Sequence, residues 1–170
     1  GVQRNVAMRF SLLVFFLAIL SWVTMAQQIS PRYELVKMSK NVNTFRHEAA
    51  PVVSPDGRTL YFFVQNHPEN TMGKEDTQDI WVSTMDPDGV WSVARHLDSP
   101  FNLHRSNQVF TVFPEGQLFI KGGSSRGDKG FSIVSGNSLQ EVKVKDFRDM
   151  NKGRFYGASM SADRTHIIMS

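Results

Sequence analysis

The chain has 170 residues, of which 41% are hydrophobic and 21% are charged, a balance that excludes intrinsically disordered and fibrous proteins. Its formal net charge is only +3, so the overall charge does not indicate a nucleic-acid partner. It contains no cysteine, which excludes disulfide bonds, thiolate zinc sites, thiol nucleophiles and a lipid-modified cysteine.

Residues 1–26 have the pattern of upstream residues followed by a secretory signal peptide. A positive charge at Arg9 precedes an apolar run of 13 residues over 10–22, and small residues precede a cleavage point after Ala26. This pattern predicts an apolar signal helix. An uncleaved membrane anchor is the alternative, because no charge occurs between Arg9 and Arg32, but a spanning helix needs ~20 apolar residues.

Removal of the signal would leave a nearly neutral chain. Arg4 and Arg9 are the basic residues before the cleavage point, which leaves 17 basic against 16 acidic residues and a net charge of +1. The local basic run from Lys143 to Arg154 is interrupted by acidic residues, whereas nucleic-acid binding requires a basic patch or stripe. We therefore predict no nucleic-acid partner, and membrane association only through an uncleaved signal or a protein partner.

The remaining chain shows a lead-in segment, residues 27–45, and then a succession of short strands. One strand is expected in the lead-in, at 33–36, and the continuous apolar run 60–64 favours a strand buried on both faces. No segment after residue 26 has a sustained helical period, so the folded part is predicted to be all-β. The other strands are expected at 50–53, 59–65, 79–84, 90–94, 108–113, 117–121, 130–134 and 139–144.

One turn pattern occurs three times. Ser-Pro-Asp-Gly at 54–57 precedes an apolar strand, and weakened copies follow at 113–116 and 161–164. Proline presets φ for such a turn, aspartate bonds the backbone two residues on, and glycine adopts the positive φ. A repeat of short strands at this spacing indicates a β-propeller or a related array. The expected domain, 46–170, is an incomplete β-propeller with blades at about 46–100 and 101–150 and a truncated third at 151–170.

Aromatic residues recur at the predicted strand positions. Large rings supply most of the apolar burial between stacked sheets, at ~25 cal/mol per Å² removed from water. We therefore assign these residues to the core: Tyr61, Phe62, Phe63, Trp81, Trp91, Phe110, Phe113 and Phe119.

The end of the sequence suggests a piece of a longer protein. The chain stops inside the apolar run 167–169, directly after a turn pattern. Closed propellers have ~4 to 8 blades of four strands each. An isolated piece with fewer blades would expose an apolar face and unpaired strand edges, and is expected to self-associate.

The first repeat resembles a known family. The turn at 54–57, the strand Asp-Ile-Trp-Val at 79–82 and the later Trp91 look like a TolB-type, WD-like propeller repeat of bacterial envelope proteins. The second copy departs from that pattern, since phenylalanine and glutamate replace serine and aspartate in its turn and residues 131–134 only faintly echo the strand. The third copy has Arg164 where glycine is usual.

This resemblance implies a non-catalytic, exported binding scaffold of the bacterial periplasm or cell surface, or a secreted one. Its partner would be another envelope protein or a peptide or glycan ligand. Related propellers also cap prolyl oligopeptidase-type hydrolases, and that alternative places a catalytic domain outside this sequence. A sugar- or peptide-binding lectin is a third possibility.

No catalytic, cofactor or metal site is predicted. Close pairs of histidine and carboxylate, such as His47 with Glu48 and His67 with Glu69, do not lie in a helical metal-binding spacing. The acidic residues of the loop that ends at Asp79 could gather around a cation, but an exposed acidic loop is the commoner outcome. No Gly-x-Ser-x-Gly elbow or phosphate loop is present.

A binding surface is predicted from position alone. The first strand of each propeller blade lines the central channel, and counting six residues back from each repeated turn gives three equivalent positions. With their neighbours they would form a mixed polar and aromatic rim, a composition that interfaces favour, or they would merely hydrate the channel. The predicted rim residues are Arg46, His47, Glu48, Asn107, Phe155 and Tyr156. Alanine at Glu48 or Asn107 is expected to weaken binding without lowering stability.

Overall fold

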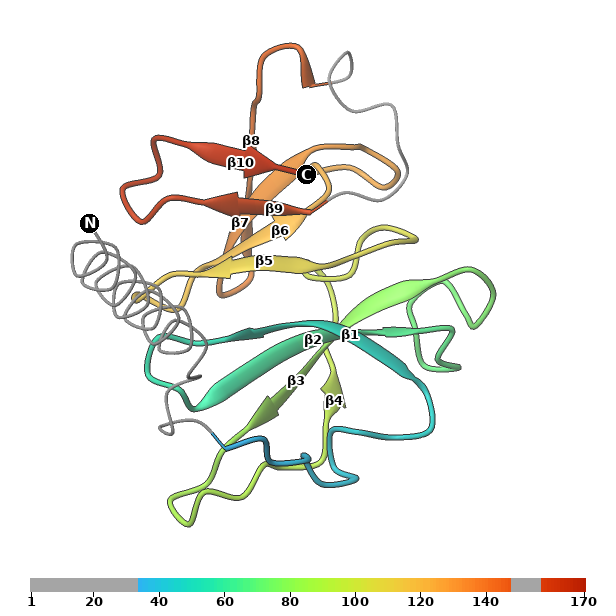
Figure 1. Cartoon of the computed structure of the whole chain (residues 1–170). Coiled ribbons are helices and arrows are strands. Elements are labelled where there is room, and N and C mark those ends of the chain that lie inside the picture. The colour runs from blue at the N-terminus through green and yellow to red at the C-terminus, as the bar shows by residue number, and fades with distance from the viewer. Residues whose placement is uncertain (1–33, 148–156) are drawn as a thin grey trace, which may run out of the picture. The chain divides into compact units, whose positions relative to one another are not determined.

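A computed structural model describes residues 34–147 and 157–170 (Figure 1). The predicted signal helix and two predicted rim residues, Phe155 and Tyr156, lie outside these ranges. The described part is built from antiparallel strands, turns and loops, which confirms the all-β class. Within these ranges there is no helix with the length and apolar character needed to cross a membrane.

The strands form two four-stranded sheets and one hairpin. Each sheet is a meander in which every strand pairs with the next one along the chain. Sheet 1 consists of β1 (His47–Val53), β2 (Thr59–Gln65), β3 (Gln78–Thr84) and β4 (Arg95–His96). Sheet 2 consists of β5 (Val109–Val112), β6 (Leu118–Lys121), β7 (Phe131–Ser135) and β8 (Ser138–Val142). The hairpin is β9 (Ala158–Met160) paired with β10 (Ile167–Met169).

Two predicted strands differ from the structure. Residues 34–36 are not a strand, and β4 begins at Arg95 instead of residue 90. The backbone N–H of Ala94 donates to the Asn41 carbonyl at 2.9 Å, and the Asn41 side-chain amide donates to the Trp91 carbonyl at 2.7 Å. The segment before β4 is therefore bonded to the lead-in as well as to β3.

Apolar clusters join the sheets in series. The first cluster lies between sheet 1 and sheet 2, and the second lies between sheet 2 and the β9–β10 hairpin. β5 lies beside both β1 and β9, so the first strands of the three units are neighbours (Figure 1). A third cluster covers the other face of sheet 1, where residues 38–45 of the lead-in cross it; its buried members are Val42, Leu60, Phe62, Val64 and Trp81.

Five of the eight aromatic residues assigned to the core are buried, and Tyr61, Phe63 and Trp91 are half-buried. Phe62, Trp81 and the three phenylalanines at positions 110, 113 and 119 are buried. Tyr61 and Phe63 are only half-buried because β2 has one fully covered face, which carries Leu60, Phe62 and Val64. Burial of the whole run 60–64 on both faces is therefore not observed.

The first copy of the repeated turn is held by its serine and aspartate. Asp56 Oδ1 accepts hydrogen bonds from Ser54 Oγ at 2.5 Å and from the Arg58 N–H at 3.0 Å, and these bonds lower the pKa of Asp56. Ser54 Oγ in turn accepts from the Thr59 N–H at 2.9 Å. Gly57 adopts φ = 75°, as the turn chemistry predicts.

The third copy forms the same turn with different residues. Asp163 Oδ1 accepts from Ser161 Oγ at 2.6 Å and from the Thr165 N–H at 3.1 Å, and Ser161 Oγ accepts from the His166 N–H at 3.0 Å. Arg164 stands in the glycine position and still adopts φ = 61°. The hydrogen bonds therefore impose the turn even without glycine.

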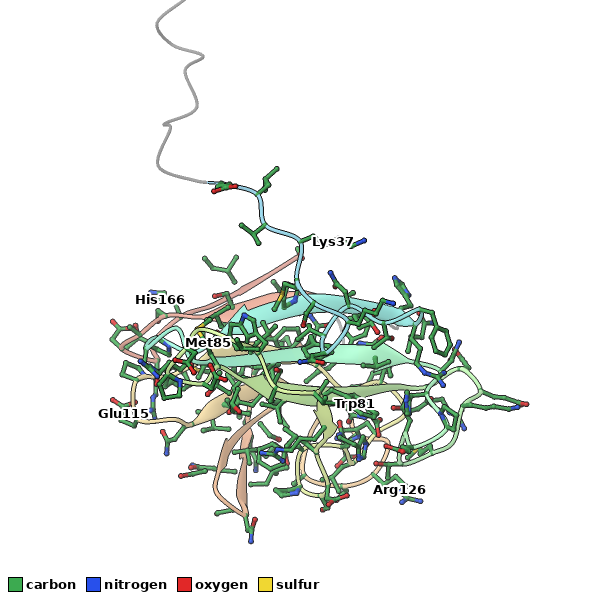
Figure 2. The ribbon with its side chains drawn as sticks, turned by 90° about the horizontal axis from the view of Figure 1, so that it is seen from below. Lys37, Trp81, Met85, Glu115, Arg126 and His166 are labelled. Carbon is green, nitrogen blue, oxygen red and sulfur yellow. The ribbon has the colours of Figure 1, made fainter. Side chains whose placement is uncertain are left out.

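The departures in the second and third copies contact each other. Phe113, which replaces serine, is buried, and the Arg164 guanidinium lies 4.4 Å from the centroid of its ring. Arg164 also donates to Gln117 Oε1 at 2.5 Å and lies 3.4 Å from the Glu115 carboxylate. These replacements form one polar and aromatic contact between neighbouring units. Figure 2 labels Glu115 and His166, from the second and third copies, at the same end of the sheets.

The middle turn is also one residue shorter than the first. Val53 faces Leu60 across the first turn, whereas Val112 faces Leu118 across the second. Because side chains alternate between the two faces of a strand, a shift of one residue exchanges the faces. When the two sheets are aligned by their paired strands, the residues after the turn are therefore offset by one position from an alignment based on the turn sequence.

This shift changes which residues of β3 and β7 are equivalent. By strand pairing, Phe131 takes the place of Ile80, and Gly130 takes the place of Asp79. The expected echo of the Asp-Ile-Trp-Val strand in residues 131–134 is therefore displaced by one residue. Sheet 2 has no counterpart of the Asp79 carboxylate.

Candidate functional site: an aromatic pocket beside a buried carboxylate

A pocket of about 300 Å³ lies on the outer face of sheet 1. Its walls come from the lead-in, from β1, β2 and β3, and from the segment just before β4. The aromatic lining residues are Phe45, Phe62, His67 and Trp81, and the charged ones are Lys40, Arg46 and Glu48. We call this hollow the aromatic pocket. It exists because the lead-in, which is a loop and not a strand, only partly covers the sheet.

A tight turn in the lead-in forms the lip of the aromatic pocket. Glu48, in β1, accepts hydrogen bonds through Oε1 from the N–H and the hydroxyl of Thr44. The Thr44 hydroxyl oxygen accepts from the Arg46 N–H at 3.0 Å. These bonds fix the backbone on both sides of Phe45, whose side chain is 90% exposed.

Trp81 forms the floor and links the pocket to the polar residues beside it. Its ring lies edge-on between His67, at a centroid distance of 4.4 Å, and His96, at 5.4 Å. The indole N–H donates to Asn70 Oδ1 at 3.3 Å. Asn70 is itself buried and also donates to the Val64 carbonyl at 3.0 Å. The long loop after β2 is thereby fixed over the tryptophan.

The pKa of His67, which lines the aromatic pocket, is lowered. Burial lowers the pKa of His67 most, and the nearby Arg46 charge lowers it further, against the opposing effects of Glu69 and Glu48. His67 Nδ1 accepts from the Glu69 N–H at 3.1 Å. The predicted pair of His67 and Glu69 is therefore joined through the backbone of Glu69 and not through its carboxylate. His67 is therefore a neutral ring at pH 7.

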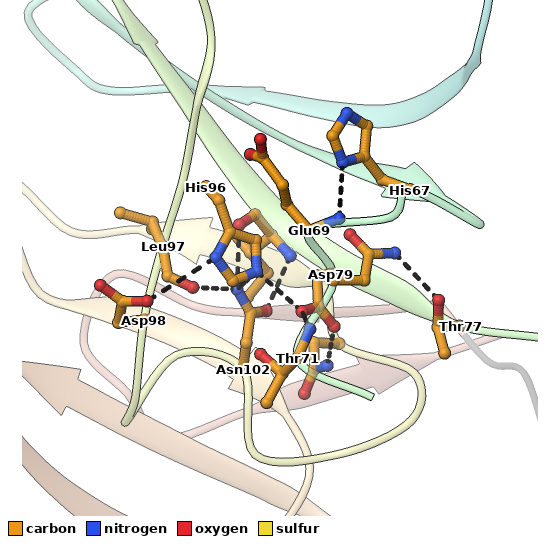
Figure 3. Close-up of polar contacts among 12 residues, drawn as sticks. His67, Glu69, Thr71, Thr77, Asp79, His96, Leu97, Asp98 and Asn102 are labelled. Atoms are coloured by element: carbon orange, nitrogen blue, oxygen red, sulfur yellow. Dashed lines mark hydrogen bonds and ion pairs between the residues drawn. The ribbon is translucent and has the colours of Figure 1, made fainter. Parts of the chain in front are cut away.

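A buried carboxylate lies next to the pocket, at Asp79 (Figure 3). Asp79 Oδ2 accepts from the Thr71 N–H at 2.6 Å and lies 2.8 Å from His96 Nε2, while Oδ1 accepts from the Asn107 amide at 2.9 Å. Three donors compensate the loss of water around this charge. We call this group the Asp79 network. The expectation of an exposed acidic loop is wrong for Asp79, because the loop folds back and donates to it, whereas Glu75 and Asp76 are exposed as expected.

Two asparagines extend the Asp79 network into the connection between the sheets. Asn102 is buried and pairs with Ile80 as a strand would: Oδ1 accepts from the Ile80 N–H at 2.7 Å, and Nδ2 donates to the Ile80 carbonyl at 3.0 Å. Nδ2 also donates to the Leu97 carbonyl at 2.5 Å. The side chain of Asn102 therefore continues the edge of sheet 1 beyond the two residues of β4.

Asn107 has the same kind of structural role. It has no exposed surface, and its Nδ2 donates to Asp79, to the Gln78 carbonyl at 3.2 Å and to the His104 carbonyl at 2.6 Å. Its Oδ1 accepts from the His104 N–H at 2.9 Å. Both polar atoms of the amide are therefore engaged inside the protein.

His104 extends this polar region to sheet 2. Its Nε2 lies 3.0 Å from the Gly123 carbonyl, and its Nδ1 accepts from the Gly127 N–H at 3.2 Å, which assigns the neutral Nε2–H tautomer. Burial lowers the pKa of His104, and Lys121 acts in the same direction against the Gly123 carbonyl and Asp128. A Cβ on Gly122 would lie 2.2 Å from the His104 ring. Only glycine fits at that position.

His96 and Asp79 form a histidine–carboxylate pair in the Asp79 network. His96 is oriented by Asp79 as a general base would be, but its other ring nitrogen faces the exposed carboxylate of Asp98 at 3.8 Å. Over the described ranges, no hydroxyl nucleophile is bonded to His96, and no group of three or more histidine and carboxylate side chains could hold a metal ion. The aromatic pocket is a hollow large enough to accept a small ligand.

The structure separates the predicted rim residues. Glu48 lines the aromatic pocket, but His47, its neighbour in β1, projects to the other face, where its Nδ1 lies 2.7 Å from Gln65 Oε1 and its ring meets Phe63. Asn107 is buried and cannot form a rim. The expectation that alanine at Asn107 leaves stability unchanged is corrected, because that substitution removes hydrogen bonds to buried groups.

Two of the predicted rim residues, Arg46 and Glu48, line the pocket, but the sequence did not predict its aromatic walls. Phe45, His67 and Trp81 come from segments that are separated in the chain, and no local spacing connects them. Trp81 was assigned to the core, which is confirmed, but it also lines the pocket. The single local signal is the exposed Phe45 next to an arginine.

Comparison with known protein families, with curated proteins and with solved structures found no match to this chain.

Proposed function

We propose that this chain is a non-catalytic binding module of the β-propeller type, exported to the bacterial periplasm or cell surface, that takes its ligand in the aromatic pocket. The observation that carries the proposal is the pocket itself, with four aromatic side chains and a few polar groups within about 300 Å³. Ligand sites are commonly concave and apolar, with a small number of polar groups.

The arrangement of the sheets supports the propeller part of the proposal. Two antiparallel meanders of four strands follow one another, they share apolar clusters with their neighbours, and their first strands lie side by side. Successive propeller blades have these three properties. Unpaired edges are protected in such a fold when further blades complete the ring.

A binding screen tests the binding part. The full chain is titrated with panels of peptides and glycans, followed by tryptophan fluorescence, and we expect at least one saturable ligand that the protein returns unchanged. A double variant, Phe45→Ala with Val93→Ser, changes two exposed side chains of the lip. It should lower the affinity for that ligand at least about tenfold, because apolar contact area is lost.

The matched control carries Leu35→Ala and Val90→Ser, which make similar changes at exposed positions that do not line the pocket. If both variants lower the affinity equally, the ligand binds at a site other than the aromatic pocket. Chemical conversion of a bound ligand by the chain would overturn the non-catalytic assignment.

N-terminal sequencing tests export. Bacterial cells that express the chain should release a form that begins at Gln27, from which the apolar run 10–22 has been removed. An intact N-terminus in the membrane fraction would favour the anchor alternative.

A further inference from the structure

We propose that the ligand of the aromatic pocket is an amphipathic anion, with an aromatic or branched apolar group against Trp81 and Phe62 and a carboxylate held by Arg46 at the lip. This inference deepens the proposed function and rests on it. The same chemistry is presented by a free aromatic acid and by the C-terminal residue of a peptide.

The apolar half of the ligand follows from the pocket walls. Trp81, Phe62 and Val64 are buried members of the outer cluster of sheet 1, and they also line the pocket. At the lip, Phe45 is 90% exposed and Val93 is 72% exposed. An apolar group that enters between floor and lip would remove mainly the exposed surface of Phe45 and Val93 from water, which is favourable by ~25 cal/mol per Å².

The anionic half follows from the charges. The Arg46 guanidinium lies 4.9 Å from the centroid of the Phe45 ring, and among the described residues it has neither an ion pair nor a side-chain hydrogen bond. Lys40 adds a second cation to the lining. Glu48 is the one acidic side chain lining this pocket, and its Oε1 already accepts from Thr44. A carboxylate complements this arrangement through charge-assisted hydrogen bonds.

The remaining polar groups argue against a glycan. The Asn41 amide donates to the Trp91 carbonyl, and the Thr44 hydroxyl is engaged with Glu48 and the Arg46 N–H. His67 is neutral and its Nδ1 accepts from the backbone of Glu69. A neutral polyol would therefore find few free partners, while a single carboxylate needs only Arg46 and Lys40.

A pair of matched probes tests the inference. The full chain is titrated with 3-phenylpropionate and with 3-phenylpropionamide, which differ only in the charged group, and tryptophan fluorescence reports binding. We expect the acid to bind at least about tenfold more tightly than the amide, the effect of one charge-assisted hydrogen bond. Added salt should reduce that ratio.

Two variants locate the effect. Arg46→Gln should bring the ratio of the two affinities close to one, whereas Arg126→Gln, an exposed arginine outside the pocket lining, should leave it unchanged. Phe45→Ala should weaken the acid and the amide by the same factor. Peptides that end in phenylalanine, as free acid or as amide, separate the two sources of the ligand.

Three results would overturn the inference: equal binding of acid and amide, an acid preference that Arg46→Gln leaves intact, or no binding of either probe. The proposed binding function would survive each of them if the peptide and glycan panels still gave a saturable ligand that the Phe45→Ala and Val93→Ser variant loses. If both experiments fail, the proposed binding function and the proposed ligand class are both refuted.

Discussion

Sheet 1 and sheet 2 have the same strand order, yet they are covered and held in different ways. Sheet 2 lies between sheet 1 and the β9–β10 hairpin, and its second face is closed by a cluster of phenylalanine rings that includes Phe119 and Phe131. Sheet 1 has a loop on its outer face and a pocket beneath that loop. It is also connected to its neighbour by the polar Asp79 network. A sheet covered by strands can be dry throughout, whereas a sheet covered by a loop retains a hollow that a ligand can fill.

The largest effect is expected from the phenyl cluster of sheet 2. Phe131 has no exposed surface, and its ring lies 5.0 Å from that of Phe119 and 5.2 Å from that of Phe147. Phe131→Ala should lower the free energy of unfolding by about 3–5 kcal/mol, measured by urea denaturation. Phe62→Ala should lower the free energy of unfolding by less, because the Phe62 side chain already borders the pocket. An equal loss of free energy in both variants would mean that the two sheets are covered equally well.

The Asp79 network should give the next largest effect. Asp79→Asn keeps the shape of the side chain but removes the charge that three donors share, so we expect a loss of about 2–3 kcal/mol in the free energy of unfolding. Asp98→Asn is the control, because that carboxylate is 98% exposed and lies 3.8 Å from His96. A neutral result for Asp79→Asn would contradict the view that the network joins sheet 1 to the connection.

Stability should also fall in mild acid. The folded-state pKa of His104 is lowered, chiefly by burial, so the unfolded chain binds the proton more readily. The stabilising contribution is therefore complete above the unfolded pKa of about 6.5 and is lost as the pH falls through the folded pKa. His67 acts in the same direction.

Urea midpoints between pH 7.5 and 5 would measure this loss, whose slope cannot exceed about 1.4 kcal/mol per pH unit for each proton. His104→Gln should flatten the profile in this range, and His67→Gln should flatten it less because His67 is only half-buried. The same profile in both variants and in the unmodified chain would show that neither imidazole controls it.

The smallest effect should come from the repeated turn. Gly57 adopts φ = 75° with open space around its missing Cβ, so Gly57→Ala should cost about 1 kcal/mol from backbone strain alone. Arg164→Gly at the equivalent position of the third copy should relieve a similar strain but lose the contacts with Phe113 and Gln117. We expect these opposing effects to leave the thermal midpoint almost unchanged. A clear stabilisation by Arg164→Gly would show that those contacts contribute little.

Local patterns in the sequence determined the strands, the turns and the all-β class. The serine, aspartate and glycine of 54–57 act within six residues, and short apolar runs between turn residues indicate β2 and β3, so both can be predicted from neighbours alone. The three copies of the turn were visible for the same reason. The one-residue shift of the second copy was not, because it depends on which residues pair across the turn.

The site, in contrast, was decided by tertiary structure. Glu48 was found by counting along the chain, but the pocket requires the lead-in to cross sheet 1 and bring Phe45 and Arg46 over Trp81. Asn107 was placed on a surface by the same counting and is buried, because its amide satisfies a carboxylate that lies 28 residues earlier in the chain. Hydrogen bonds and apolar contacts between distant segments depend on how the sheets stack, and a local pattern carries no record of that geometry.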